Sequence, residues 1–304
     1  FDPDIFLVDK EPLGLRGEAE PTLRALKARG TRLVLGLRDV MDDPASLADE
    51  WERKQAVRAL EHIYDEVWVY GKEAVHDPLE GIAVSEAVRR KMLFTGYLRR
   101  EMPAVDVSAD DNPFGDEPFI LVTPGGGGDG MELIDWVLKA YEAHERPLFP
   151  ALVVLGPFMP AERQAEFRAR ADALRDVHVI RFTPVIERLM GQATAIVGMG
   201  GYNIFCEILS FDKPTLLVPR IVPRREQAIR AAKAEAAGLV TQLPIEAYPD
   251  VDIMTDALAE LPERPSPSEA GHDHLLSGLD TINARTETIL RTPRRAQPAL
   301  SLVR

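Results

Sequence analysis

The sequence predicts an α/β protein of two domains, each a parallel sheet wrapped by helices. Three observations support this. Short apolar runs alternate with amphipathic helical segments along most of the chain. A stretch rich in proline, aspartate and glycine, residues 101–118, interrupts the alternation. Two glycine-rich turns, at residues 124–130 and 198–201, each follow an apolar run directly, as is typical of ligand sites at the carboxyl edge of doubly wound sheets.

The first domain is expected over residues 1–102. Its amphipathic pattern is clearest where five residues fall roughly on one stripe of a helix, namely Leu47, Trp51, Val57, Leu60 and Ile63. Strands are expected at residues 4–9, 31–36, 66–70 and 91–95, and helices at residues 21–29 and 44–64. Four strands with helices between them predict a partial parallel sheet that is covered on both faces.

The second domain is expected over residues 118–291, after a linker at residues 103–117 and before a tail at residues 292–304. Its strands are expected at residues 119–123, 152–155, 177–182, 194–197, 214–219 and 239–243. Its helices are expected at residues 131–144, 161–174 and 185–192, from residue 204, from residue 226, and at residues 250–261 and 273–290. This repetition of strand and helix specifies a doubly wound parallel sheet.

Composition limits the partners. The 304 residues suffice for two domains with cores, and 45% hydrophobic and 28% charged residues are ordinary for a globular protein. A net charge of -13 argues against a nucleic-acid partner. The single Cys206 excludes an internal disulfide, which favours a cytoplasmic location. No stretch predicts a transmembrane helix, which leaves peripheral membrane contact open.

The second glycine turn carries the strongest site signal. A buried strand ends in the turn that contains Gly198, Gly200, Gly201, Tyr202 and Asn203, and an apolar helix with one acid, Glu207, follows. A helix N-terminus presents unpaired N–H groups and a positive dipole, and glycines let a ligand approach closely, so a phosphate is the expected guest. A carboxylate on such a helix can accept hydrogen bonds from a ribose diol. The alternative is a capping or ion-pairing acid.

The spacing of this region resembles that of the GT-B glycosyltransferases. Glu207 lies six residues after Gly201, Pro214 seven further on, and Gln227 follows a strand that ends in proline. The likeness is strongest to the transferases that add N-acetylglucosamine to the lipid-linked peptidoglycan precursor, and it extends over residues 119–290. It implies that Glu207 binds the ribose hydroxyls and that Gln227 contacts the donor sugar. Residues 9–14 and 36–39 look like those of a bacterial branch of predicted glycosyltransferases.

The resemblance also sets expectations for both ends of the chain. A GT-B N-terminal domain opens with a strand, a glycine-rich loop and a helix, whereas Phe1 is followed almost at once by the strand at residues 4–9. The N-terminal domain is therefore expected to be incomplete. In GT-B proteins the last helix commonly returns to the first domain, which this sequence alone does not show.

The first glycine turn and a third loop give weaker signals. Gly125, Gly126 and Gly127 belong to a turn that fits neither a Walker A loop nor a dinucleotide fingerprint. The resemblance places such a turn near the donor phosphates; the alternative is a simple tight turn. It also implies that the loop at Phe182 holds the uracil edge through backbone groups, although an ordinary strand-to-helix turn is an equal alternative.

A basic loop precedes Gln227. Arg224, with Arg220 and Arg225, could neutralise a diphosphate leaving group, so metal-independent chemistry is expected, with no metal site and no cofactor beyond the UDP-sugar donor substrate. A solvated basic loop is the alternative.

Transfer to a hydroxyl acceptor needs a general base near the donor. Asp9, Glu11 and Asp39 follow strands of the first domain and are candidates, although each alone is more typical of a structural role. Lys10 or Arg38 could orient an anionic acceptor.

The sequence therefore predicts a hexosyltransferase that moves a sugar, with N-acetylglucosamine as the leading choice, from a UDP-sugar to an unidentified acceptor. A UDP-sugar epimerase or hydrolase of the same fold is the first alternative. A non-catalytic module that binds sugar nucleotides is the second.

Overall fold

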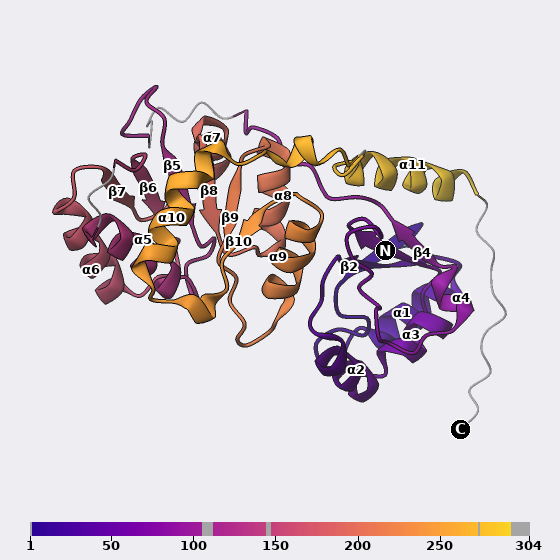
Figure 1. Ribbon diagram of the computed structural model, residues 1–304. Coiled ribbons are helices and arrows are strands. Elements are labelled where there is room, and N and C mark those ends of the chain that lie inside the picture. The colour runs from indigo at the N-terminus through magenta and orange to yellow at the C-terminus, as the bar shows by residue number, and fades with distance from the viewer. Residues whose placement is uncertain (1, 105–111, 144–146, 273, 293–304) are drawn as a thin grey trace. The chain divides into compact units, whose positions relative to one another are not determined.

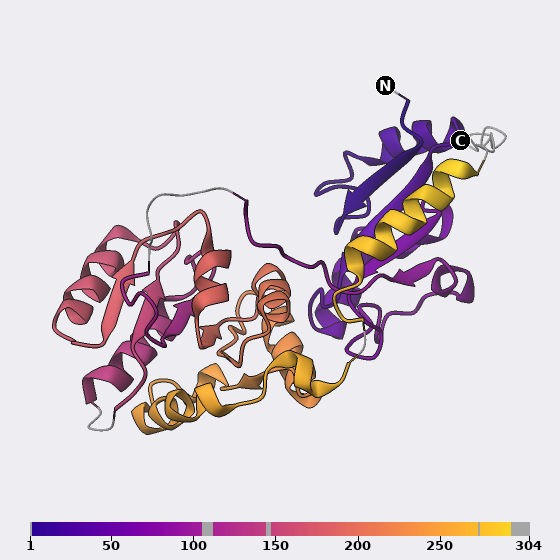
Figure 2. The same ribbon diagram turned by 90° about the horizontal axis from the view of Figure 1, so that it is seen from above.

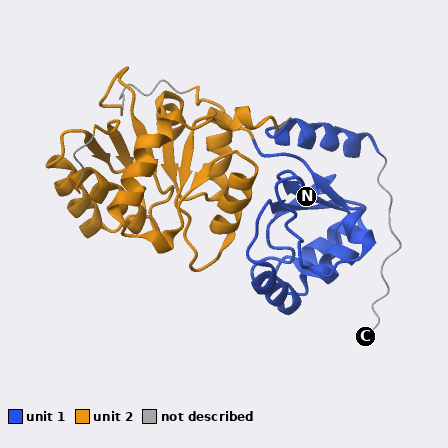
Figure 3. Cartoon of the chain, viewed as in Figure 1, with its two compact units in different colours: residues 1–98, 274–304 blue, residues 99–273 orange. Residues whose placement is uncertain are grey.

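A computed structural model describes residues 2–104, 112–143, 147–272 and 274–292. The chain forms two compact units, which Figure 3 shows in different colours. The first combines residues up to 98 with those from 274 onward, and the second holds residues 99–273. The chain thus crosses between the units twice.

The first unit is built on a four-stranded parallel sheet in the order β1-β2-β3-β4. Leu33, Leu35 and Leu37 project from one face of this sheet into a core that Leu23 and Trp51 complete from the helices. The strands are β1 (Ile5–Asp9), β2 (Arg32–Arg38), β3 (Glu66–Tyr70) and β4 (Met92–Phe94), and the helices are α1 (Glu20–Ala28), α2 (Pro44–Arg53), α3 (Ala56–His62) and α4 (Glu86–Arg89). The expected strands are confirmed.

The single helix expected at residues 44–64 is wrong, because the chain forms α2 and α3 there instead. Gln55 separates them in the left-handed conformation, with φ of 52°. A left-handed residue cannot continue a right-handed helix. The apolar stripe survives because both helices pack on the same core. Periodicity therefore predicted the buried face correctly and missed the break.

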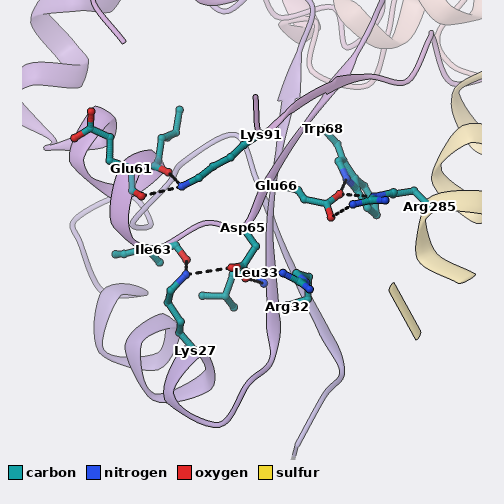
Figure 4. Close-up of polar contacts among 11 residues, drawn as sticks. Lys27, Arg32, Leu33, Glu61, Ile63, Asp65, Glu66, Trp68, Lys91 and Arg285 are labelled. Carbon is teal, nitrogen blue, oxygen red and sulfur yellow. Dashed lines mark hydrogen bonds and ion pairs between the residues drawn. The ribbon is translucent and has the colours of Figure 1, made fainter. Parts of the chain in front are cut away.

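Two lysines complete the C-terminal end of α3 (Figure 4). Lys91 Nζ donates to the carbonyls of Leu60 and Glu61, at 2.6 and 2.8 Å. Lys27 Nζ donates to the Ile63 carbonyl at 2.6 Å and forms an ion pair with Asp65 at 3.3 Å. The last carbonyls of a helix lack intrahelical partners and carry partial negative charge, so these cations stabilise the helix end.

The last helix, α11 (Gly278–Arg291), belongs to the first unit, not to the second domain in which the sequence placed it. Figure 2 shows it lying along the strands of that unit. Glu66 accepts two hydrogen bonds from Arg285, at 2.6 and 2.9 Å, and one from Trp68 Nε1 at 2.9 Å (Figure 4). Burial opposes ionisation of Glu66, but the hydrogen bonds from Arg285 and Trp68 outweigh it and hold the pKa of this carboxyl below its ordinary value.

The second unit is built on a six-stranded parallel sheet in the order β10-β9-β8-β5-β6-β7 (Figure 1). The strands are β5 (Ile120–Thr123), β6 (Ala151–Val154), β7 (Val177–Ile180), β8 (Ala195–Gly198), β9 (Thr215–Leu217) and β10 (Thr241–Gln242). The α-helices are α5 (Met131–Ala143), α6 (Ala161–Asp172), α7 (Ile186–Gln192), α8 (Tyr202–Phe211), α9 (Glu226–Ala236) and α10 (Val251–Glu260). Three 3₁₀ turns follow β10, at Ile245–Ala247, Leu261–Glu263 and Pro267–Ala270.

The strand order of the second unit reverses between β5 and β8. The chain moves outward from β5 to β7, returns to place β8 on the other side of β5, and continues to β10. The loops that follow β5 and β8 therefore border the position where doubly wound sheets bind ligands. The doubly wound prediction is confirmed for this unit. In the described part of the first unit the strands run in chain order, without such a reversal.

Parts of the predicted linker and tail lie outside the described residues, namely 105–111 and 293–304. The end of the predicted linker packs on the second unit, because Asn112 Nδ2 donates to Gln192 Oε1 at 3.3 Å. Within the described ranges, no helix has both the length and the apolarity needed to cross a bilayer.

Candidate functional site

The two glycine turns predicted from the sequence meet at the reversal point. In the β5–β8 pair Thr123 lies opposite Gly198, and a Cβ on Gly198 would lie 3.3 Å from the Thr123 carbonyl oxygen. A Cβ on Gly125 would lie 3.4 Å from Cγ1 of Ile204 in α8. The small residues thus allow strand, turn and helix to approach closely, and they bring residues 124–130 beside the start of α8.

The turn after β8 leads directly into a helix. Gly201 is the N-cap residue of α8, and its carbonyl accepts the first helical hydrogen bond, from Phe205 N at 2.9 Å. Tyr202 and Asn203, expected within the turn, are instead the first helical residues. No side chain caps this helix start in the described structure, so its first N–H groups suit an anionic ligand.

Glu207 lies on α8 and is 9% exposed. Its Oε2 atom is buried and has no hydrogen-bond partner among the described residues. Burial raises the pKa of Glu207 to about 7; the charge of Glu187 adds to the increase and that of Arg100 opposes it. A buried carboxyl oxygen without a partner is costly to a folded protein, which weighs against the reading of Glu207 as an ion-pairing acid.

Helix α9 supplies Gln227 and a residue that the sequence analysis did not select, Arg230. Gln227 is buried, and its Oε1 accepts a hydrogen bond from Arg220 N at 3.2 Å. Its Nε2 lies near Gly201, because a Cβ built on that glycine would be 3.9 Å away from it. Arg230 is 1% exposed and donates from Nη1 to the Gly200 carbonyl at 2.8 Å. The available signal was an arginine three residues after Gln227, on the same side of a helix and between the apolar residues Ile229 and Ala231.

The basic loop is more strongly neutralised than the sequence indicates. Arg220 forms ion pairs with Asp129 at 2.7 Å and with Glu226 at 2.8 Å, so its charge is already balanced by two carboxylates. The pair with Asp129 connects this loop to the first glycine turn. Arg224 is half-buried, and its carbonyl accepts from Arg220 Nη1 at 3.0 Å.

Packing explains part of the first glycine turn. Gly125 and Gly127 have φ near +84° and +85°, and a Cβ on Gly127 would lie 2.3 Å from the Leu155 carbonyl oxygen. A Cβ on Gly126 would lie 3.3 Å from the Phe158 ring, and Phe158 N donates to the Gly126 carbonyl at 3.0 Å. At Gly127 the glycine is thus required by the turn and by its packing on Leu155, whereas a Cβ on Gly128 would have no atom within 4 Å.

This difference gives a matched pair of substitutions. Gly127→Ala should destabilise the protein by at least about 1–2 kcal/mol, because the left-handed conformation alone costs about that much for a residue with a Cβ, and the clash with Leu155 adds to it. Gly128→Ala should change the free energy of unfolding by less than about 0.5 kcal/mol. Urea denaturation of both variants measures this. Equal destabilisation would contradict the packing argument.

Phe182 lies in the loop after β7 and is 52% exposed. The next residue, Thr183, is buried and accepts from Val185 N through Oγ1 at 3.2 Å, which fixes the turn into α7. Glu187 on α7 acts electrostatically on Glu207. The turn into α7 thus leads to Glu187, whose charge acts on Glu207, while the side chain of Phe182 is exposed.

The three candidate bases lie in the first unit and differ in their surroundings. Asp39 is fully buried, where its Oδ1 accepts from Val40 N at 2.7 Å and its Oδ2 from Tyr97 Oη at 3.1 Å. Glu11 forms an ion pair with Lys54 at 2.7 Å. Asp9, at the end of β1, is exposed. Asp39 and Glu11 thus have evident structural partners, and Asp9 is the most accessible of the three carboxylates.

Metal ligands do not gather in the part of the chain that the structure describes: no group of three or more His, Cys, Asp or Glu residues there could hold a metal ion.

Comparison with known proteins supports the fold and a distant relationship. No family model matches the chain. Over 149 residues, 49% of this chain, it is 28% identical to a UDP-N-acetylglucosamine--N-acetylmuramyl-(pentapeptide) pyrophosphoryl-undecaprenol N-acetylglucosamine transferase from Phenylobacterium zucineum. The match spans 41% of that relative's length.

Solved structures share the architecture at low sequence identity. A glycosyltransferase of kitacinnamycin matches with a TM-score of 0.63 at 17% identity, covering 94% of this chain and 76% of that one. MurG of Acinetobacter baumannii matches at 0.52 and 13% identity, covering 94% and 99%. MnaA of S. aureus, in a structure with UDP, matches at 0.56 and 14% identity, covering 96% and 78%. These likenesses show that the fold is GT-B. The resemblance predicted from the sequence is confirmed.

Proposed function

We propose that the protein is a glycosyltransferase that takes a UDP-sugar as donor and transfers the sugar to an acceptor hydroxyl. The observation that carries this proposal is the buried, unpartnered carboxyl oxygen of Glu207, on a helix whose uncapped N-terminus follows the glycine turn at the reversal point. A ribose diol would supply the missing hydrogen bonds, and a diphosphate would fit the helix N-terminus.

Each part of this arrangement has a role in the proposed reaction. The N–H groups of Gly201, Tyr202 and Asn203 would stabilise the negative charge that develops on the departing UDP as the acceptor hydroxyl attacks the anomeric carbon. Glu207 would fix the ribose and Gln227 the donor sugar. Of the candidate bases, Asp9 is exposed at the end of β1, which favours it as the group that would take the proton of the acceptor.

The Phenylobacterium relative supports N-acetylglucosamine as the sugar, because that protein is named for its transfer. The UDP in the MnaA structure supports a uridine nucleotide. The acceptor stays open, since neither the candidate site nor these similarities define its chemistry.

The test of this proposal is nucleotide selectivity followed by product analysis. Isothermal titration should show that UDP binds more tightly than ADP or GDP. Equal affinities for the three nucleotides would contradict the proposal that the site recognises uracil. Incubation with UDP-N-acetylglucosamine alone then separates the alternatives. An epimerase or hydrolase turns over without an acceptor, a binding module retains UDP without turnover, and a transferase needs an added acceptor for transfer.

Transfer should not depend on a divalent metal if helix N-termini and arginines stabilise the leaving group. Activity measured with excess EDTA should stay within about twofold of that in buffer alone. Activity that returns only after addition of Mg²⁺ or Mn²⁺ would show that a metal, rather than these groups, neutralises the diphosphate.

A further inference from the structure

Arg230 is held in an unusual place for an arginine. It lies on α9, is 1% exposed, and directs Nη1 onto the carbonyl oxygen of Gly200 at 2.8 Å. Its guanidinium also lies over the ring of Tyr202, 5.7 Å from the centroid. Arginine stays charged even when buried, so a fixed positive charge lies beneath the turn after β8.

The contact with Gly200 determines where the next N–H points. In a trans peptide the C=O and the N–H lie in one plane and point in opposite directions. Gly200 has φ of +80° and its peptide to Gly201 is not among the cis bonds of the described chain. Because Arg230 holds the Gly200 oxygen toward the interior, the Gly201 N–H points away from Arg230.

We infer that Arg230 is a positioning residue: it orients the Gly200–Gly201 peptide so that the Gly201 N–H, with the first N–H groups of α8, faces a diphosphate. This inference rests on the proposed function, because it assigns the anion to the donor nucleotide. Arg230 acts through the turn and does not itself contact the ligand. Gln227, one helical turn earlier on α9, lies beside the same peptide, so one helix would place both groups.

The inference predicts a split between ligands with and without phosphates. Arg230→Met keeps a long apolar side chain but removes the charge and the hydrogen bond to Gly200. It should weaken binding of UDP and of inorganic pyrophosphate at least tenfold, and leave uridine binding within about twofold, because Glu207 and the uracil contacts do not depend on this peptide. Arg230→Lys keeps a cation that can donate to the Gly200 oxygen, although without the planar fork of arginine, and should recover part of the loss.

Isothermal titration with UDP, pyrophosphate and uridine measures this, with thermal denaturation to confirm folding of each variant. Lys233→Met is the matched control, since Lys233 is exposed on the same helix; it should bind all three ligands as the wild type does. If Arg230→Met fails to fold, Arg230→Lys carries the comparison. A parallel loss of uridine and UDP affinity, or no loss at all, overturns the inference.

The wild-type titrations separate this inference from the proposed function. If the wild type binds pyrophosphate but neither UDP nor uridine, and Arg230→Met loses pyrophosphate, the positioning role stands and the uridine nucleotide assignment falls. If the wild type binds UDP, and Arg230→Met binds both UDP and pyrophosphate as tightly as the wild type does, the proposed function stands and the positioning role falls. If the wild type binds none of the three, both fall.

Discussion

Replacing Glu207 with alanine should weaken UDP binding by about 10- to 150-fold. Glu207 is buried with one carboxyl oxygen unpartnered, so in the complex it would accept one or more charge-assisted hydrogen bonds from the ribose. One such bond contributes about 1.5–3 kcal/mol, which converts to this range of affinities. Isothermal titration of wild type and variant with UDP measures the effect.

Two comparisons make this result specific to the ribose. The wild type should prefer UDP to 2′,3′-dideoxy-UDP, and Glu207→Ala should have lost that preference. Glu187→Gln is the control, because it removes a negative charge that raises the pKa of Glu207. Glu207 should then be ionised more readily, so UDP affinity should be unchanged or higher. If Glu207→Ala folds and binds UDP as the wild type does, the role assigned to Glu207 is wrong.

The sequence predicted the parts of the fold that depend on local pattern. Each strand of the second unit was expected within a few residues, because short apolar runs bounded by glycine and proline have few other solutions. The last helix was predicted as a helix but assigned to the second domain, because its contact with the first unit joins Glu66 to Arg285, which are far apart in the sequence. The break at Gln55 also left no signal, because glutamine is ordinarily compatible with a helix.

The candidate site shows the same division. Gly201, Glu207 and Gln227 could be selected because their spacing is a property of the sequence. The structure then shows the two glycine turns side by side, which follows from the strand order and not from any local motif. The ion pair between Arg220 and Asp129, and the contact of Arg230 with Gly200, each join separate loops. Contacts of this kind depend on tertiary packing, so neither the carboxylate partners of Arg220 nor the contact of Arg230 with Gly200 could be predicted from the sequence.

Glu207→Gln should make the ligand-free protein more stable at alkaline pH, by up to about 3 kcal/mol. The pKa of Glu207 is about 7 in the folded protein against an ordinary value of 4.5. Between these values the folded state binds more protons than the unfolded state, so the free energy of unfolding falls as pH rises from about 4.5 to about 7. Each unit of separation corresponds to about 1.4 kcal/mol, and glutamine removes the ionisation while keeping the shape.

Urea denaturation of the wild type and Glu207→Gln at pH 5, 6, 7 and 8 tests this expectation. The two proteins should differ by about 1 kcal/mol or less at pH 5, where Glu207 is neutral in the folded protein, and the difference should grow as pH rises. Saturating UDP should reduce the difference, because ribose hydroxyls bind the ionised carboxylate more strongly than the neutral amide. A variant that is less stable than the wild type at pH 8 would mean that Glu207 has a structural partner. The expected result would instead mean that ionised Glu207 destabilises the ligand-free protein. Its carboxylate would then gain its hydrogen bonds only when a nucleotide is bound.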